Sequence, residues 1–124
     1  MKQTYRSVID FVNNAGAYVQ AHPEENKLKY ALQKVQKKAL KMLQAYNDSL
    51  EDLRVENCAT DEKGVVLRDP NGNYQFTKEG LTAFNKAQRA FITTGTVDID
   101  AYIVTELPEN FEEGFREVFT GFVL

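Results

Sequence analysis

The stretch PEENKLKYALQKVQKKALKMLQAYNDSLEDLRVEN, residues 23–57, decides the fold. Its apolar residues recur at spacings of three and four, which predicts one amphipathic helix from about Pro23 or Glu24 to about Asn57. Roughly 30 residues at 1.5 Å per residue span about 45–50 Å, longer than a compact domain of this size is wide. We therefore expect part of the helix to project. The apolar stripe consists of Leu28, Leu32, Val35, Ala39, Met42, Tyr46, Leu50 and Leu53.

The same helix carries a charged stripe that changes sign halfway along. Lysines occupy its first half, and acids continue the same line in the second half. This order opposes the helix dipole, which favours acids near the N-terminus. The stripe could meet opposite charge on an antiparallel second copy or on the acidic residues 98–117. The alternative is that it is simply a solvent-exposed face of the helix. The candidate interaction residues are Lys34, Lys38, Lys41, Asp48, Asp52 and Glu56.

Periodicity and capping residues predict further elements on both sides of the long helix. Three more helices are expected, over Thr4–Ala21, over Lys78–Ile92 with Thr77 as its cap, and over about Glu109–Thr120. A β-hairpin of residues 65–68 and 74–76 is expected to pair with a strand at 97–104, forming three antiparallel strands. The predicted class is α+β and predominantly helical. It comprises a helical hairpin with one long helix, a small antiparallel β-sheet and a C-terminal helix.

Length and composition limit the organisation to one domain. The 124 residues carry 15 Lys and Arg against 18 Asp and Glu, with 43% hydrophobic residues, which is typical of a folded globular chain. We assign residues 1–124 to a single domain, helical over about 1–58 and α+β over about 59–124. No stretch approaches the ~18–20 apolar residues of a membrane span, and no signal peptide is visible, so the expected location is the cytoplasm.

The sequence predicts no catalytic, cofactor-binding or metal-binding residue. One His and one Cys cannot supply a zinc site, and the common catalytic motifs are absent. The loop at 69–73 resembles the opening of a calcium loop, but its Gly falls fourth instead of sixth, which favours a tight turn. Asp98 and Asp100 suit the solvent face of a strand, and His22 suits a solvated cap. A negative net charge of −3 and a lysine stripe without Arg argue against nucleic-acid binding.

The carboxyl end is strongly apolar and requires cover. Burial of such side chains is worth roughly 1.5–3 kcal/mol each, so either the core or a partner must shield them. Phe122 and Leu124 are therefore further candidate interaction residues. The apolar residues of this end are Phe111, Phe115, Phe119, Phe122, Val123 and Leu124.

The order of elements resembles a family of small bacteriophage proteins over roughly residues 25–124. The shared layout is a long charged helix, the turn Ala59–Gly64, a hairpin with Asn71-Gly72-Asn73-Tyr74, a β segment at Val97–Val104, and Leu107-Pro108-Glu109-Asn110-Phe111 before a terminal helix. The helix at Thr4–Ala21 departs from this layout. The resemblance implies a phage-encoded protein in the bacterial host cytoplasm that acts by contact, either in a virion or tail assembly or upon a host protein.

The residues and the resemblance lead to the same functional expectation. We expect a non-enzymatic interaction or assembly protein without a cofactor, which contacts a protein partner or a second copy of itself. A small inhibitor or regulator of a host or defence enzyme is the alternative. Its surfaces, and not a catalytic site, would carry either function.

Overall fold

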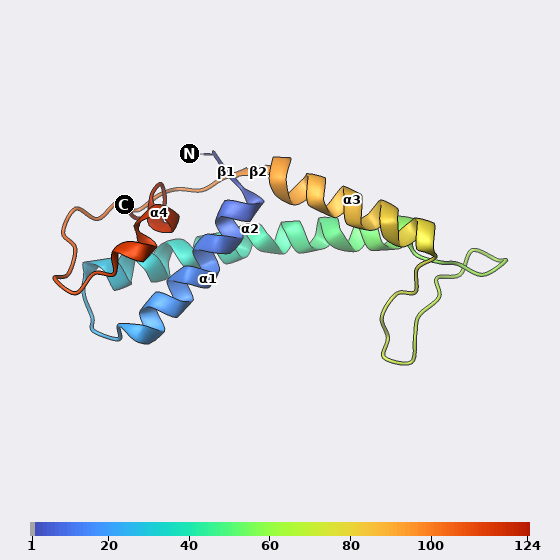
Figure 1. Ribbon diagram of the computed structural model, residues 1–124, viewed down its shortest axis with the longest axis horizontal. Coiled ribbons are helices and arrows are strands. Elements are labelled where there is room, and N and C mark those ends of the chain that lie inside the picture. The colour runs from blue at the N-terminus through green and yellow to red at the C-terminus, as the bar shows by residue number, and fades with distance from the viewer. Residues whose placement is uncertain (1) are drawn as a thin grey trace.

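The computed structural model describes residues 2–124, of which 59% are helical. An elongated molecule is built along one long helix, with a small antiparallel sheet at one side and a short helix near the carboxyl end (Figure 1). The predicted fold class is therefore confirmed. In chain order the elements are β1 Lys2–Thr4, α1 Tyr5–Ala21, α2 Lys27–Asn57, α3 Lys78–Thr94, β2 Thr96–Asp98, the 3-10 helix η1 Glu113–Phe115 and α4 Arg116–Phe119.

Helix α2 forms the axis of the fold and begins later than the sequence predicted. Its N-cap is Asn26, whose side chain accepts a hydrogen bond from the Lys29 N–H at 2.9 Å. Asn is among the best N-cap residues, so it outcompetes Pro23 and Glu24 as the start of the helix. The C-terminal bound at Asn57 agrees with the prediction.

Helix α1 packs against the N-terminal half of α2 and supplies one side of the main core. Thr4 caps α1, and its side chain accepts a hydrogen bond from the Ser7 N–H. Gln36 of α2 donates to the Val12 carbonyl of α1 at 3.1 Å, which ties the two helices at their shared edge. The buried side chains of α1 are Val8, Phe11, Ala15 and Tyr18, and those of α2 in the same core are Leu28, Ala31, Leu32, Val35 and Ala39.

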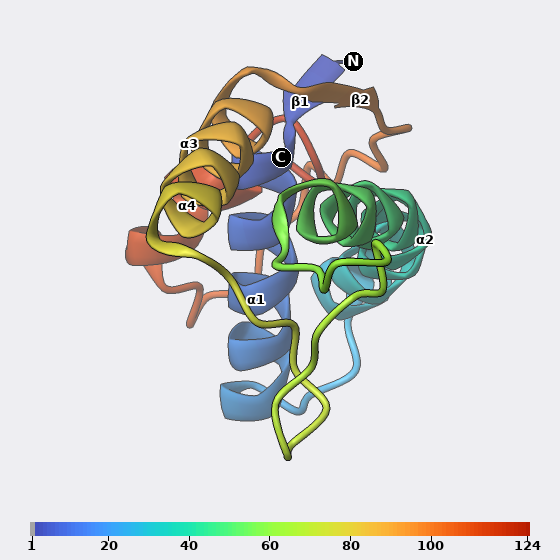
Figure 2. The ribbon, with the colours of Figure 1, turned by 90° about the vertical axis from the view of Figure 1, so that its right-hand side faces the viewer.

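Helix α3 covers the C-terminal half of α2. Thr77 caps it as predicted, with its side chain accepting from the Gly80 N–H. Phe91 of α3 stacks on Tyr46 of α2 at 5.5 Å between ring centroids. Tyr46 and Leu50 are consequently buried. The apolar stripe of α2 is thus largely covered within the chain, and α1 and α3 lie on the same side of α2 (Figure 2).

The β-sheet has two strands and joins the chain's beginning to its later part. β1 pairs with β2 in antiparallel register, with Gln3 opposite Val97. The expected three-stranded sheet, in which residues 97–104 pair with the hairpin, is wrong. Helix α3 leads away from the hairpin and brings β2 beside the start of α1 (Figure 1). β2 therefore pairs with the N-terminal strand β1 instead of the hairpin.

The hairpin at 59–76 projects from the end of α2 and forms only two isolated bridges, Thr60–Val66 and Arg68–Tyr74. The Asp69 carboxylate accepts hydrogen bonds from the N–H groups of Asn71 and Asn73, as in an Asx turn. These bonds commit Asp69 to the turn, in agreement with the turn interpretation of this loop.

The carboxyl end folds onto α1 with less helix than predicted. The expected helix over Glu109–Thr120 is reduced to η1 and α4, which together cover residues 113–119. Phe119, Phe122 and Val123 enter the main core. Within residues 2–124, no helix combines the length and apolarity needed to cross a membrane.

Candidate interaction site

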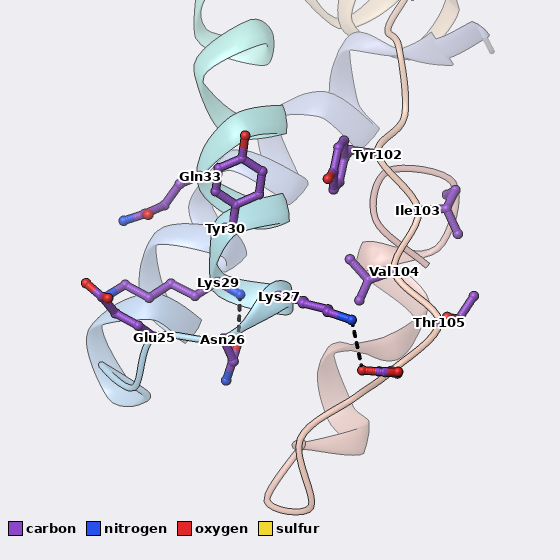
Figure 3. Close-up of a pocket in the computed structure, with 11 residues that line it drawn as sticks. Glu25, Asn26, Lys27, Lys29, Tyr30, Gln33, Tyr102, Ile103, Val104 and Thr105 are labelled. Atoms are coloured by element: carbon purple, nitrogen blue, oxygen red, sulfur yellow. Dashed lines mark hydrogen bonds and ion pairs between the residues drawn. The ribbon is translucent and has the colours of Figure 1, made fainter.

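An open groove of about 860 Å³ lies between the N-terminal turns of α2 and the extended segment 102–106. Figure 3 shows Tyr30 and Gln33 on the helical wall, with Tyr102 and Val104 on the opposite wall. The segment after β2 has no regular secondary structure and runs back alongside α2 (Figure 1). The groove therefore brings together residues that are about 70 positions apart in the sequence.

Two tyrosines and a lysine form one end of the groove. The rings of Tyr30 and Tyr102 meet edge to face with their centroids 5.7 Å apart. The Lys34 ammonium lies 4.6 Å from the Tyr102 centroid and 5.8 Å from that of Tyr30, within the range of cation–π attraction. Tyr30 is nevertheless 57% exposed and Tyr102 39% exposed, so much of their ring surface is available for contact.

An ion pair crosses the other end of the groove. The Lys27 Nζ lies 3.1 Å from a carboxylate oxygen of Glu106 (Figure 3). Both side chains are about three-quarters exposed, so the pair adds only about 0–1 kcal/mol to stability. Lys29 donates to the Pro23 carbonyl at 3.0 Å and fixes the turn that precedes α2.

The extended wall uses only alternate backbone groups for internal hydrogen bonds. The N–H groups of Tyr102 and Val104 donate to the carbonyls of Phe122 and Val123 at 2.9 and 2.8 Å. Alternate residues of an extended chain direct these groups to opposite sides. The intervening N–H groups of Ile103 and Thr105 have no hydrogen-bond partner among residues 2–124, so this edge remains open.

The six predicted charged residues of α2 all lie on its outer surface. Five of them are exposed and Lys38 is half-buried. The ion pairs of residues 2–124 are His22–Glu112, Lys27–Glu106, Glu51–Arg54 and Glu113–Arg116, none of which involves these six side chains. Acidic residues 98–117 therefore meet the lysine half of α2 at one point, the Lys27–Glu106 pair, and make no ion pair with these six side chains.

The two predicted interaction residues of the carboxyl end lie elsewhere. Phe122 is buried at 2% exposure and stacks on Phe11, and Leu124 is half-buried against the same core. The apolar carboxyl end is thus buried against the core of the same chain and not by a partner. These side chains do not offer the exposed surface that an interaction role demands.

Other residues that the sequence singled out occupy structural positions. His22 ends α1 as predicted, but its ring is not solvated: its Nε2 lies 2.6 Å from a Glu112 carboxylate oxygen, and its ring stacks on Tyr18. Cys58 is the half-buried C-cap of α2. Among the described residues, no three His, Cys, Asp or Glu side chains are placed to hold a metal ion.

The groove itself was missed by the sequence interpretation. Tyr30 precedes Lys34 by one helical turn, and this placement of an aromatic residue on the charged face was the one available signal. Tyr102 and Ile103 belong to a segment that was assigned to the sheet. Their approach to α2 depends on β2 pairing with β1, which no local pattern encodes.

No family model, curated protein or solved structure matches this chain. The resemblance to small bacteriophage proteins therefore stays a prediction, and the function must be argued from the site.

Proposed function

We propose that this is a non-enzymatic interaction protein that binds an extended, acidic segment of a partner protein in the groove between α2 and residues 102–106. The observation that carries the proposal is the exposed pair Tyr30 and Tyr102 beside an open backbone edge. Tyrosine is enriched at protein interfaces because one ring offers a large apolar surface together with a polar tip. Partner side chains would lie on these rings and on Ile103, which is 55% exposed.

The open edge favours an extended segment as the occupant. The free N–H groups of Ile103 and Thr105 can bond to backbone carbonyls of an added strand, the mode known as β-augmentation. Side chains at alternate positions of that strand would then face the helical wall at Tyr30 and Gln33.

The charges beside the groove favour an acidic segment. Lys34 and Lys37 follow Tyr30 by one and two turns of α2, and neither makes an ion pair within residues 2–124. Glu106 is neutralised by Lys27 at the opposite end. The combination of free lysines and a paired acid attracts carboxylates and repels a basic segment. The resemblance of the sequence to small bacteriophage proteins is the support for a virion or tail protein as the proposed partner.

Selection of peptides tests this function without knowledge of the partner. A displayed library of random 12-residue peptides is selected on the immobilised protein, and the recovered peptides are titrated against two variants. Tyr30→Ser/Tyr102→Ser should weaken binding at least tenfold, whereas Leu81→Ser, which removes a 46% exposed side chain on α3, should leave binding unchanged. Recovered sequences should combine acidic and apolar residues. Recovery of no binder, of basic peptides only, or of peptides that bind the groove variant equally well would refute the proposal.

A further inference from the structure

If a second copy of α2 lies antiparallel to the first, the charges on the outer faces of the two helices are complementary. Ala45, an exposed small residue, lies at the centre of the charged stripe. Lys34 and Glu56 are each eleven residues from it, and Lys38 and Asp52 are each seven. Lys41 precedes it by four residues and Asp48 follows by three. Lys34 and Lys38 thus have an acid at an equal distance on the other side of Ala45, and Lys41 has one that is a single residue off.

The angular positions of these charges also match. Lys34 and Asp52 are 18 residues apart, and so are Lys38 and Glu56. Because 18 residues make five turns of an α-helix, the members of each pair lie on one line parallel to the axis. An antiparallel second copy is generated by a two-fold axis that passes through the contact, perpendicular to the plane of the two helices. This rotation reverses the direction of the helix, but a line of residues on one side of the contact stays on that side in the second copy. On the same side of the contact, Lys34 then lies four residues, about 6 Å, along the axis from Asp52 of the second copy, and Lys38 lies equally far from its Glu56. At the same height, Lys34 faces Glu56 and Lys38 faces Asp52 on the adjacent line.

Among residues 2–124, no helix covers this face, and the segment after β2 touches it at one end, where Tyr102 lies against Lys34. Helices α1 and α3 lie on the opposite side of α2, as Figure 2 shows in a view along the helix. Asp98 and Asp100 on the neighbouring segment are exposed and make no ion pair with the stripe. Lys34, Lys38 and Lys41, and the three acids that follow them, make no ion pair among residues 2–124.

We infer that a second copy of this chain docks antiparallel on the outer face of α2, with the two-fold axis at Ala45. This contact adjoins the groove, whose lining residues from α2 are Lys27, Lys29, Tyr30 and Gln33. The two surfaces meet at Lys34, which lies over the rings of Tyr30 and Tyr102. The apolar stripe of α2 is largely covered by α1 and α3, with Met42 still 38% exposed, so charge must supply most of the attraction.

The size of the contact sets the expected strength. The face from Lys34 to Glu56 is about 33 Å long, and a helix offers a strip about 10 Å wide, so roughly 300 Å² per copy is buried. Stable dimers bury about 800 Å² per partner. The dimer is therefore weak, with a dissociation constant in the high micromolar range, and strongly weakened by salt.

Sedimentation velocity at about 20 mM and about 500 mM salt gives the first test. Wild-type protein at high micromolar concentration should show dimers at low salt and monomers at high salt. The variant Lys34→Glu/Lys38→Glu/Lys41→Glu should stay monomeric at both. Its matched control, Lys63→Glu/Lys78→Glu/Lys86→Glu, has the same net charge with the stripe intact and should behave as wild type. A monomeric wild type at low salt, or equal effects of the two triple variants, would overturn the inference.

A charge-swap pair tests the register. Lys41→Glu alone should weaken association roughly tenfold, because the two-fold axis makes each pair occur twice. Adding Asp48→Lys restores opposite charges at matching positions and should recover wild-type association. Adding Glu56→Lys instead gives the same net charge but leaves like charges facing, and should not recover it. Equal rescue by both second substitutions would exclude this antiparallel register. The triple variant includes Lys34, which also borders the groove, whereas Lys41, Asp48 and Glu56 do not line it. The outcome of the charge swap is therefore independent of the groove.

Discussion

The ring of Phe122 stacks on the ring of Phe11 with their centroids 4.3 Å apart and their planes 11° from parallel. This contact joins the carboxyl end to α1, and both residues are fully or almost fully buried. The last residues of the chain are therefore part of the core. They also hold the extended wall of the groove in place, because the Phe122 carbonyl accepts a hydrogen bond from the Tyr102 N–H.

Replacement of Phe122 by Ala should lower the free energy of unfolding by about 3–5 kcal/mol, as expected for removal of a buried ring. Urea unfolding followed by circular dichroism measures this change. Leu81→Ala, at a 46% exposed position of α3, is the matched control and should cost far less. Equal losses for the two variants would show that the Phe11–Phe122 contact contributes little.

Removal of Glu109–Leu124 should have a larger effect than any single substitution. The deletion uncovers the α1 core by removing Phe119, Phe122 and Val123, which are all buried. The truncated chain should therefore melt at a sharply lower temperature or become insoluble. An unchanged melting temperature would mean that the segment is dispensable for folding.

Gly80→Ala should destabilise the protein by at least about 1 kcal/mol, although alanine is the better helix former by about that amount. A Cβ at position 80 would lie 2.3 Å from the Asn57 carbonyl oxygen, a backbone atom that cannot move freely. This close approach is what packs the first turn of α3 against the end of α2. Thermal melting of the Gly80→Ala variant is compared with that of Gly114→Ala. The new methyl group at position 114 would have no neighbour within 4 Å, so that substitution should be neutral or slightly stabilising.

Tyr18→Phe should raise the free energy of unfolding by up to about 1 kcal/mol at neutral pH. The Tyr18 hydroxyl is buried without a hydrogen-bond partner among the described residues, and an unsatisfied polar group carries a desolvation cost. A loss of more than about 1 kcal/mol would show that the hydroxyl makes a favourable interaction.

The same substitution should flatten the alkaline part of the stability profile. Burial raises the pKa of Tyr18, and the carboxylates of Glu112 and Glu24 raise it further. The folded state therefore holds this proton more tightly than the unfolded state, whose tyrosine pKa is about 10. The resulting stability is complete below that value and is lost as the pH rises through the folded-state pKa. Unfolding measured at several pH values between about 9 and 11 should show a steeper decline for wild type than for Tyr18→Phe.

Local chemistry made the helices predictable. The three- and four-residue spacing of apolar side chains located α1, α2 and α3, and Thr77 was identified as a cap because its hydroxyl can accept a backbone N–H. Asn26 was overlooked as the cap of α2, since Pro23 and the acids after it offered a competing start. These features depend on residues within one or two turns of each other, so the sequence by itself determined them.

Tertiary structure decided how the strands pair and where the groove lies. β2 alternates like a strand in isolation, but its partner depends on where α3 delivers it, and that is beside Gln3 and not beside the hairpin. The approach of Tyr102 to Tyr30 follows from this pairing and from the bonds to the carboxyl end. The charged stripe of α2 was visible in the sequence because one helix carries all of it, whereas its exposure depends on the side to which α1 and α3 bind. Contacts between distant segments are set by packing of the whole chain, and no local pattern records them.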